Sequence, residues 1–317
     1  MNSHSAQADS RANDRRQALA IAALLASVAI WGLQFAMVRI AVTTSVTALD
    51  VTLLRYIFAF PIMLPLAWMY IARVGSAIDW KRALIVGSIG GAPVFLVSNF
   101  GLQFAPASHA SCLQPGTVAV VATSYLLATS GARRTPLMPL GLAVAVAGLA
   151  FVALGGAGGA GVGPLTPLGD ALFVVSGIFW AAYTILMARW KMPPALMTAL
   201  SAVLSLLVTP LFIPFMESRL ASASWREIIL HGAFQGIVSY AIAFLLWSYA
   251  AKILGPVRAG FSAPLIPAFG VLIAIPVLGE WPQPLQWVGV AGVALGLLTI
   301  ALAQLGPRQS ASPFTKS

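Results

Sequence analysis

The ionisable side chains of this 317-residue sequence could in principle support acid–base, nucleophilic or metal-dependent chemistry, but their spacing favours none of these. The three histidines are His4, His109 and His231, so the zinc-binding HExxH motif is absent. The single cysteine, Cys112, excludes an intramolecular disulfide and a CxxC metal site. No aspartate pair lies at the centre of an apolar stretch, and no Ser–His dyad is evident. Because catalysis needs mutually positioned groups, the sequence argues against an enzyme, including an intramembrane one, and predicts neither a metal nor a cofactor.

The same side chains restrict the ligands that the chain could bind. None of the eight acidic residues lies near the centre of an apolar stretch. A proton-coupled exporter of organic cations would need a carboxylate there, for which the proton and the cation compete. A phosphate-bearing substrate would call for several buried Lys or Arg residues, and only Arg55 lies clearly inside an apolar stretch. A neutral or zwitterionic metabolite therefore fits best.

The composition indicates that lipid is the solvent for most of the chain. Hydrophobic residues make up 59% of the sequence and charged residues only 8%, with a mean hydropathy of +0.91. A soluble domain normally has about a quarter charged residues. The net charge of +10 does not indicate a nucleic-acid partner, because the basic residues are scattered between apolar stretches.

The elements that must position the polar residues are membrane-spanning helices, which need about 20 mostly apolar residues each. We therefore predict an all-α membrane protein. Ten stretches qualify as spans: 18–38, 50–71, 83–103, 108–129, 137–155, 168–188, 195–216, 228–250, 256–278 and 286–305.

The distribution of Lys and Arg between alternate loops predicts the orientation. With the N-terminus inside, the cytoplasmic side holds 14 of the 18 basic residues. The outer side holds only Arg39, Arg219 and Arg226, while Arg55 lies in the second span. We therefore expect a multi-pass protein of the inner (plasma) membrane with both termini in the cytoplasm.

An internal repeat relates the two halves at an offset of 149 residues. Ser27 and Trp31 match Ser176 and Trp180, and prolines 61 and 65 match prolines 210 and 214. Because each half has an odd number of spans, the halves must have opposite orientation, which is a common plan of secondary transporters. We predict five-helix repeats at 15–156 and 165–306, with disordered tails at 1–14 and 307–317.

The spans and motifs resemble the drug/metabolite transporter superfamily, specifically its EamA-type ten-helix exporters. The resemblance covers residues 18–305 and rests on 27-SVAIWGLQFAMVR-39, 53-LLRYIFAF-60, Pro115, Pro264 and 276-PVLGEW-281. Within the family, the sequence is most similar to the aromatic amino-acid exporter branch. The resemblance implies alternating access through a central cavity lined by spans one, three, four, six, eight and nine.

The cavity spans that the resemblance implies contain a set of polar and aromatic residues, which we predict to bind the substrate. Aromatic faces with a few amides suit an amphipathic ligand that has an apolar side chain. The candidates are Trp31, Gln34, Asn99, His109, Ser111, Gln114, Trp180, Tyr183, Gln235, Ser239, Tyr240, Trp247 and Ser262.

Each candidate also has a purely structural interpretation. Trp31 and Trp180 could pack in the core, and Asn99 and Gln235 could bridge helices. His109, which we place near the cytoplasmic start of the fourth span, is either a neutral hydrogen-bonding residue or linked to proton movement.

The charged residues near span ends have structural interpretations as well. Arg55 could bind a substrate carboxylate, but its position near the outer end of the second span favours snorkelling to lipid headgroups. We expect Asp170 to cap the sixth span and Glu280 to end the ninth at the outer surface.

The leading functional hypothesis is an exporter of aromatic and other neutral amino acids, whose partners are a small-molecule substrate and membrane lipids. Alternatives on the same fold are a multidrug or other metabolite exporter and a lipid flippase. The sequence leaves open proton antiport against facilitated diffusion, and it is compatible with a monomer.

Overall fold

The computed structural model describes residues 2–74, 78–129, 136–155, 161–255, 259 and 262–305, and these form helices and short connections without a strand. This confirms the prediction of an all-α membrane protein. Among the described residues, nine helices are long and apolar enough to cross a membrane, and a tenth apolar helix, Leu265–Leu278, is shorter.

The helices follow the predicted spans in order. The first half contains α1 (Asn2–Thr44), α2 (Ala48–Val74), α3 (Trp80–Ile89), α4 (Ala92–Gly101), α5 (Ala107–Thr129) and α6 (Leu137–Leu154). The second half contains α7 (Thr166–Arg189), α8 (Pro194–Val208) with its 3₁₀ extension η2 (Thr209–Phe212), α9 (Trp225–Gly232), the π-helix η3 (Ala233–Ile242), α10 (Ala243–Leu254), α12 (Leu265–Leu278) and α13 (Pro284–Leu305).

Two boundaries differ from the sequence prediction. Helix α1 extends back to Asn2, so residues 2–14, expected to be a disordered tail, continue the helix. This stretch contains no Pro or Gly and includes three Ala residues, so a helix nucleated in the span propagates through it. In the ninth span, predicted from 256, the described helix α12 begins at Leu265, directly after Pro264, and residues 256–258, 260 and 261 lie outside the described residues. The predicted C-terminal tail, 307–317, lies outside the described residues.

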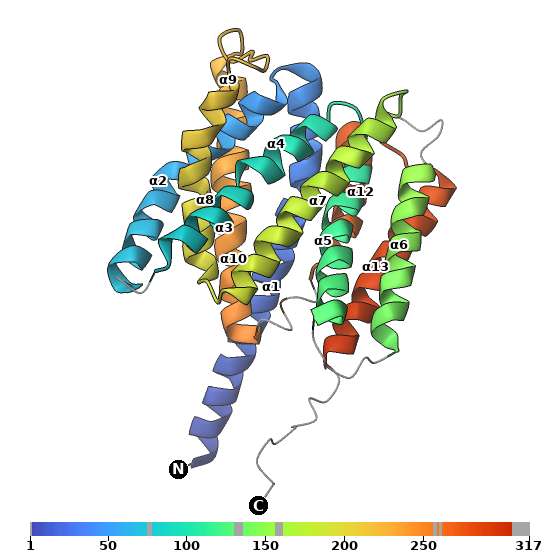
Figure 1. Cartoon of the computed structure of the whole chain (residues 1–317). Coiled ribbons are helices and arrows are strands. Elements are labelled where there is room, and N and C mark those ends of the chain that lie inside the picture. The colour runs from blue at the N-terminus through green and yellow to red at the C-terminus, as the bar shows by residue number, and fades with distance from the viewer. Residues whose placement is uncertain are drawn as a thin grey trace, which may run out of the picture.

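The N-terminal end of α1 and the C-terminal end of α13 lie at the same end of the bundle (Figure 1). We call this the proximal end and the opposite one the distal end. Helices α6 and α13 lie side by side at the right-hand edge of Figure 1. Glycines make this approach possible: a Cβ on Gly148 would lie 2.5 Å from the backbone nitrogen of Val293. None of the predicted binding residues lies on these two helices.

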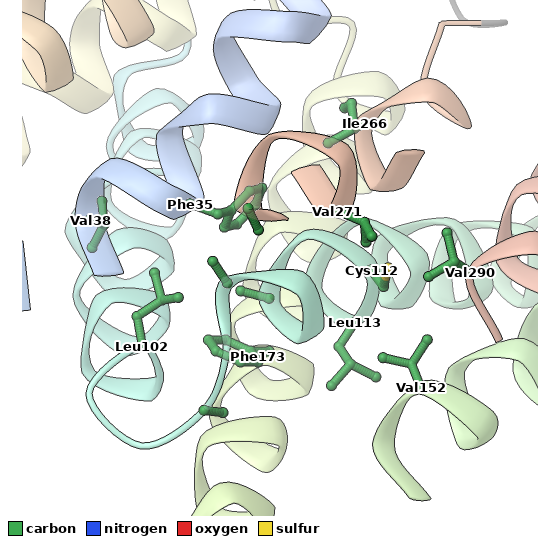
Figure 2. Packing of buried hydrophobic residues seen from close by; sticks show 14 of the residues in the cluster. Phe35, Val38, Leu102, Cys112, Leu113, Val152, Phe173, Ile266, Val271 and Val290 are labelled. Carbon is green, nitrogen blue, oxygen red and sulfur yellow. The ribbon is translucent and has the colours of Figure 1, made fainter. Parts of the chain in front are cut away.

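The largest apolar core joins the two halves mainly in the distal part of the bundle (Figure 2). Phe35 and Val38 of α1 and Leu102 after α4 belong to it, together with Phe173 of α7 and Val271 of α12. Cys112 is fully buried in this core as a free thiol. The distal part is therefore tightly packed around helices from both halves.

Candidate functional site

Two helices depart from regular α-geometry, and they do so at equivalent places in the two halves. The third span breaks at Gly90 and Gly91 between α3 and α4. The eighth span, Trp225–Leu254, is continuous but is wound as a π-helix over η3. The 149-residue offset relates Gly90 and Gly91 to Ser239 and Tyr240 of η3. Interrupted helices at matching positions in the two halves are a strong indication of a transporter binding site.

The break in the third span is required by close packing. A Cβ on Gly90 would lie 2.2 Å from the Tyr183 ring, and one on Gly91 would lie 1.9 Å from Oγ of Ser205. The Ser205 hydroxyl accepts a hydrogen bond of 2.7 Å from the backbone N–H of Ala92, which satisfies a donor at the start of α4. The side chains of the second half thus occupy the space that the two glycines leave.

The π-helix faces a buried arginine on α2. Arg55 is only 3% exposed, and its Nη1 donates to Oε1 of Gln34 at 3.1 Å and to Oε1 of Gln235 at 2.7 Å. Ser239, one turn after Gln235, donates its hydroxyl proton to the same oxygen of Gln34. Helices α1, α2 and η3 therefore meet at one guanidinium.

Aromatic rings complete the surroundings of Arg55. The centre of the guanidinium lies 3.8 Å from the centroid of the Phe95 ring and 5.1 Å from that of Tyr240. Tyr56 packs edge-on against both rings, with centroids 6.4 Å and 5.8 Å away. Such cation–π contacts are strengthened by exclusion of water. We call Gln34, Arg55, Phe95, Gln235, Ser239 and Tyr240 the central cluster.

The central cluster lies well inside the bundle. Arg55 comes seven residues after the start of α2 at Ala48, about 10 Å along the helix axis. Gln235 comes ten residues after the start of α9 at Trp225, about 15 Å along that span. These depths place the cluster within the membrane-spanning part of both helices. The expectation that Arg55 snorkels is wrong, because α1, α4 and η3 cover it.

Arg55 lacks an acidic partner in the described part of the chain. Among the described residues, no carboxylate forms an ion pair with it. Its Nε is buried without a hydrogen-bond partner, as is Nε2 of Gln235. Buried charges are normally paired, so a buried guanidinium that contacts only amides and rings is unusual.

Six predicted binding residues thus contact one another in or beside the central cluster. Trp31 donates its indole N–H to the backbone oxygen of Ser239 at 3.2 Å, and the Tyr240 hydroxyl donates to the backbone oxygen of Thr198 at 2.8 Å. The six are Trp31, Gln34, Arg55, Gln235, Ser239 and Tyr240. Sequence reasoning missed Phe95, since a phenylalanine in an apolar span carries no signal of its own. Its position four residues after Gly91 was the available clue.

Asn99 and Gln114 bridge helices near the central cluster. Asn99, one turn after Phe95, donates to Oγ1 of Thr52 at 3.0 Å and so links α4 to α2. Gln114 donates to Oγ of Ser176 at 2.7 Å, which links α5 to α7.

Four further candidates pack elsewhere. Trp180 and Tyr183 belong to an apolar cluster with Met197 and Leu200, although the Tyr183 ring also fills the space at Gly90. Trp247 packs against Leu24, and Ser262 donates to the backbone oxygen of Ala259 at 2.7 Å.

A second polar network closes the distal end. Arg39 of α1 pairs with Glu280 after α12, with Nε 3.5 Å from Oε1. Glu280 Oε2 also accepts the backbone N–H of Ala107 at 2.9 Å, at the N-terminus of α5. Arg39 further donates to the backbone oxygen of Leu102 after α4. Burial raises the pKa of Glu280, a shift that Arg39 opposes. Glu280 was expected at the outer surface, but it is only 6% exposed.

His109 belongs to this distal region rather than to the cytoplasmic end where we expected it. Its Nδ1 lies 2.8 Å from Oδ1 of Asp170, and its Nε2 contacts the amide of Gln286 near the start of α13. Asp170 lies within α7, four residues after its first residue Thr166, so it links α7 to α5 instead of capping its helix. The fourth span runs from the distal to the proximal end, which puts its first turn at the distal end.

Cavities lie near both ends of the bundle. The proximal one, of about 560 Å³, lies between the proximal ends of α5, α7 and α13 and the start of α12. Thr123, Tyr125, Thr184 and Arg189 supply its polar lining, and Leu297 and Ile300 supply part of its apolar wall. A smaller cavity of about 390 Å³ lies at the distal end, between the end of α1 and the start of α9.

Comparison with known proteins gives a consistent result. The sequence pattern of the EamA-like transporter family matches residues 18–154 and again residues 167–302. A probable terminal-alkyne amino-acid exporter from Streptantibioticus cattleyicolor is 28% identical over 92% of this chain and 97% of its own length. An uncharacterized transporter from Archaeoglobus fulgidus is 24% identical over 88% of this chain and 93% of its own.

A solved crystal structure of similar fold extends the comparison. It aligns with a TM-score of 0.58 and 19% sequence identity, and it covers 94% of this chain and 99% of its own. At this identity the likeness shows the shared fold alone.

Proposed function

The chain belongs to the EamA-like transporter family, and on this premise we propose that it exports aromatic and other neutral amino acids. The family and the names of the relatives indicate a transporter rather than an enzyme. The Streptantibioticus relative, named as an amino-acid exporter, supports this substrate class.

The observation that carries the proposal is the central cluster. Residues of both halves meet there, as a transporter with two repeats requires. The cluster combines a guanidinium, two amides and a hydroxyl with the rings of Phe95, Tyr240 and Trp31. A zwitterion with an apolar side chain needs both kinds of surface.

The route that we propose runs from the proximal to the distal end. The excess of Lys and Arg in the loops on the side of the termini supports a cytoplasmic proximal end, in a protein that we propose to lie in the inner membrane. Substrate enters from the proximal cavity, and the Arg39–Glu280 network at the distal end must separate before it leaves. This order supports alternating access around the central cluster.

The proposal is tested with purified protein in liposomes. Labelled phenylalanine, tryptophan and leucine are expected to cross faster than in protein-free liposomes, and unlabelled phenylalanine is expected to compete. Absence of flux for every amino acid in the panel contradicts the proposal. Lipid scrambling by the same preparation without solute flux would support a flippase instead. Repeating the flux with and without an imposed pH gradient separates proton antiport from facilitated diffusion.

A further inference from the structure

We propose that Arg55 is the anchor for the substrate carboxylate, and that the amide oxygens of Gln34 and Gln235 occupy the carboxylate's place when no substrate is bound. This inference rests on the proposed function and names the part of the substrate that the central cluster selects.

The first argument is electrostatic. A guanidinium that is 3% exposed and forms no ion pair with a described carboxylate carries a desolvation cost that neutral amides offset only in part. The acids in the surrounding helices have other partners: Asp50, five residues earlier on α2, accepts from Ser218 Oγ and the backbone N–H of Arg219, and Asp170 contacts His109. A carboxylate brought by the substrate supplies the missing charge.

The second argument is geometric. A guanidinium binds a carboxylate through two parallel N–H donors. Both amide oxygens, from Gln34 and Gln235, contact Nη1, while Nε has no partner although it is buried. The two amide oxygens thus share one donor nitrogen, where a carboxylate oxygen would replace them, and the buried Nε remains as an unused donor.

The third argument concerns how the amides leave. Gln235 is presented by η3, whose hydrogen bonds span five residues rather than four. The π-helix is a rare conformation that is less regular than the α-helix on either side of it. Rewinding part of η3 as α-helix would rotate Gln235 away from Arg55 without breaking the span. The π-helix η3 therefore both places the amide oxygen of Gln235 on Arg55 and provides a conformational change that would remove it.

The aromatic residues around Arg55 indicate which side chain the ligand has beside its carboxylate. Phe95 and Tyr240 lie against the faces of the guanidinium, and the indole of Trp31 is held beside them by its hydrogen bond to Ser239. A carboxylate on Arg55 would place an adjacent apolar side chain among these rings. The preferred ligand class is a small carboxylic acid with an aromatic or aliphatic side chain, of which α-amino acids are the transported members.

The decisive experiment compares ligands that differ only in the carboxylate. Thermal stabilisation of the wild-type protein in detergent is measured with phenylalanine against phenethylamine, tryptophan against tryptamine, and 3-phenylpropionate against 3-phenylpropionamide. We expect the carboxylate of each pair to bind about 10- to 100-fold more tightly, as the loss of a charge-assisted hydrogen bond predicts. Equal binding within each pair, or absence of binding by every carboxylate, overturns the proposal.

Variants connect this preference to Arg55. Arg55→Gln is expected to remove the difference within each pair, and Arg55→Lys to restore part of it, since lysine keeps the charge but not the planar fork. Arg82→Gln, which removes an exposed arginine paired with Asp79 on α3, is the control and should leave the preference intact. A preference that persists in Arg55→Gln also overturns the anchor.

The same panel separates the anchor from the transport function. Carboxylates that bind through Arg55 but are not moved in liposomes would support the anchor and contradict amino-acid export. Amino acids that are moved as fast as their amines would support a transporter and contradict the anchor.

Discussion

A partly buried arginine, Arg39, and a buried one, Arg55, show how differently one residue type is used in this bundle. Arg39 has a carboxylate partner in Glu280 and also donates to backbone oxygens, so its charge is neutralised within the protein. Arg55 contacts amide oxygens and aromatic rings and has no carboxylate partner among the described residues. The first arrangement ties four segments together at the distal end. The second leaves a charge that only a ligand can neutralise.

The comparison distinguishes a structural arginine from a binding one by the partners of the guanidinium rather than by burial. Both side chains lie in spans of the first half, and both contact residues of the second half. An arginine that holds helices together is satisfied in the resting protein. An arginine that binds an anion must remain incompletely satisfied until the anion arrives, which costs stability.

The largest effect should follow from removing the paired arginine. In Arg39→Leu, Glu280 remains buried without its counter-charge, and the backbone oxygen of Leu102 loses a donor. We expect the free energy of unfolding to fall by about 3 kcal/mol, as when one partner of a buried ion pair is removed. Chemical denaturation in detergent measures this change. The double variant Arg39→Leu with Glu280→Leu should recover much of the loss, and no recovery would show that the pair is not coupled.

The sequence predicts features that depend on neighbouring residues better than it predicts contacts between residues far apart in the chain. The ten spans follow from local runs of apolar residues, and the offset between the halves follows from matched Trp and Pro positions. We wrongly expected Arg55 to snorkel to lipid headgroups, because the distance of a residue from a span end does not reveal which helices cover its side chain. Three spans, α1, α4 and η3, come together around it only in the folded bundle.

The pairing of Arg39 with Glu280 was likewise beyond the sequence. The two residues are far apart in the chain, and the neighbours of each indicate only a charged residue at the end of a span. The π-winding of η3 also has no local signature, although Gly90 and Gly91 at the equivalent place in the third span mark the break there. The sequence therefore predicts elements and polar residue types well, and it predicts poorly which of them meet.

The second prediction concerns Arg55, whose removal should reduce transport strongly and stability little, unlike the removal of Arg39. Arg55→Leu removes a buried charge that lacks a carboxylate partner, and Ser239 continues to satisfy Gln34. The desolvation cost that is removed offsets the donor that Oε1 of Gln235 loses. We expect the free energy of unfolding to stay within about 1 kcal/mol of the wild type, while amino-acid flux falls at least about tenfold. Denaturation and liposome flux are measured on the same preparation. A loss of stability as large as that of Arg39→Leu would mean that Arg55 is structural.

The third prediction concerns a variant in which Arg55, like Arg39, is paired with a carboxylate of the protein. Gln235→Glu would give Arg55 an internal carboxylate at a position where Oε1 already lies 2.7 Å from Nη1. We expect the protein to be at least as stable as the wild type and the affinity for phenylalanine to fall about tenfold, because the new carboxylate competes for the guanidinium. Gln286→Glu, beside His109 in the distal network, is a matched control for the added charge. Unchanged affinity in Gln235→Glu would argue that substrate does not use this face of Arg55.

The smallest effect should come from the aromatic contact that partly replaces a counter-charge at Arg55. Phe95→Leu keeps an apolar side chain beside the guanidinium but removes the ring whose centroid lies 3.8 Å from it, a loss of about 1 kcal/mol for a desolvated cation–π pair. We expect the Michaelis constant for phenylalanine to rise about fivefold with little change in the maximal rate, since the ring orients the guanidinium and packs against the substrate side chain. Phe100→Leu, which removes a ring that packs on Phe104 beyond the central cluster, should leave both kinetic constants unchanged. If Phe95→Leu instead lowered stability as much as transport, the ring would support the fold of α4 rather than the charge of Arg55, and the contrast between the two arginines would rest on the missing carboxylate alone.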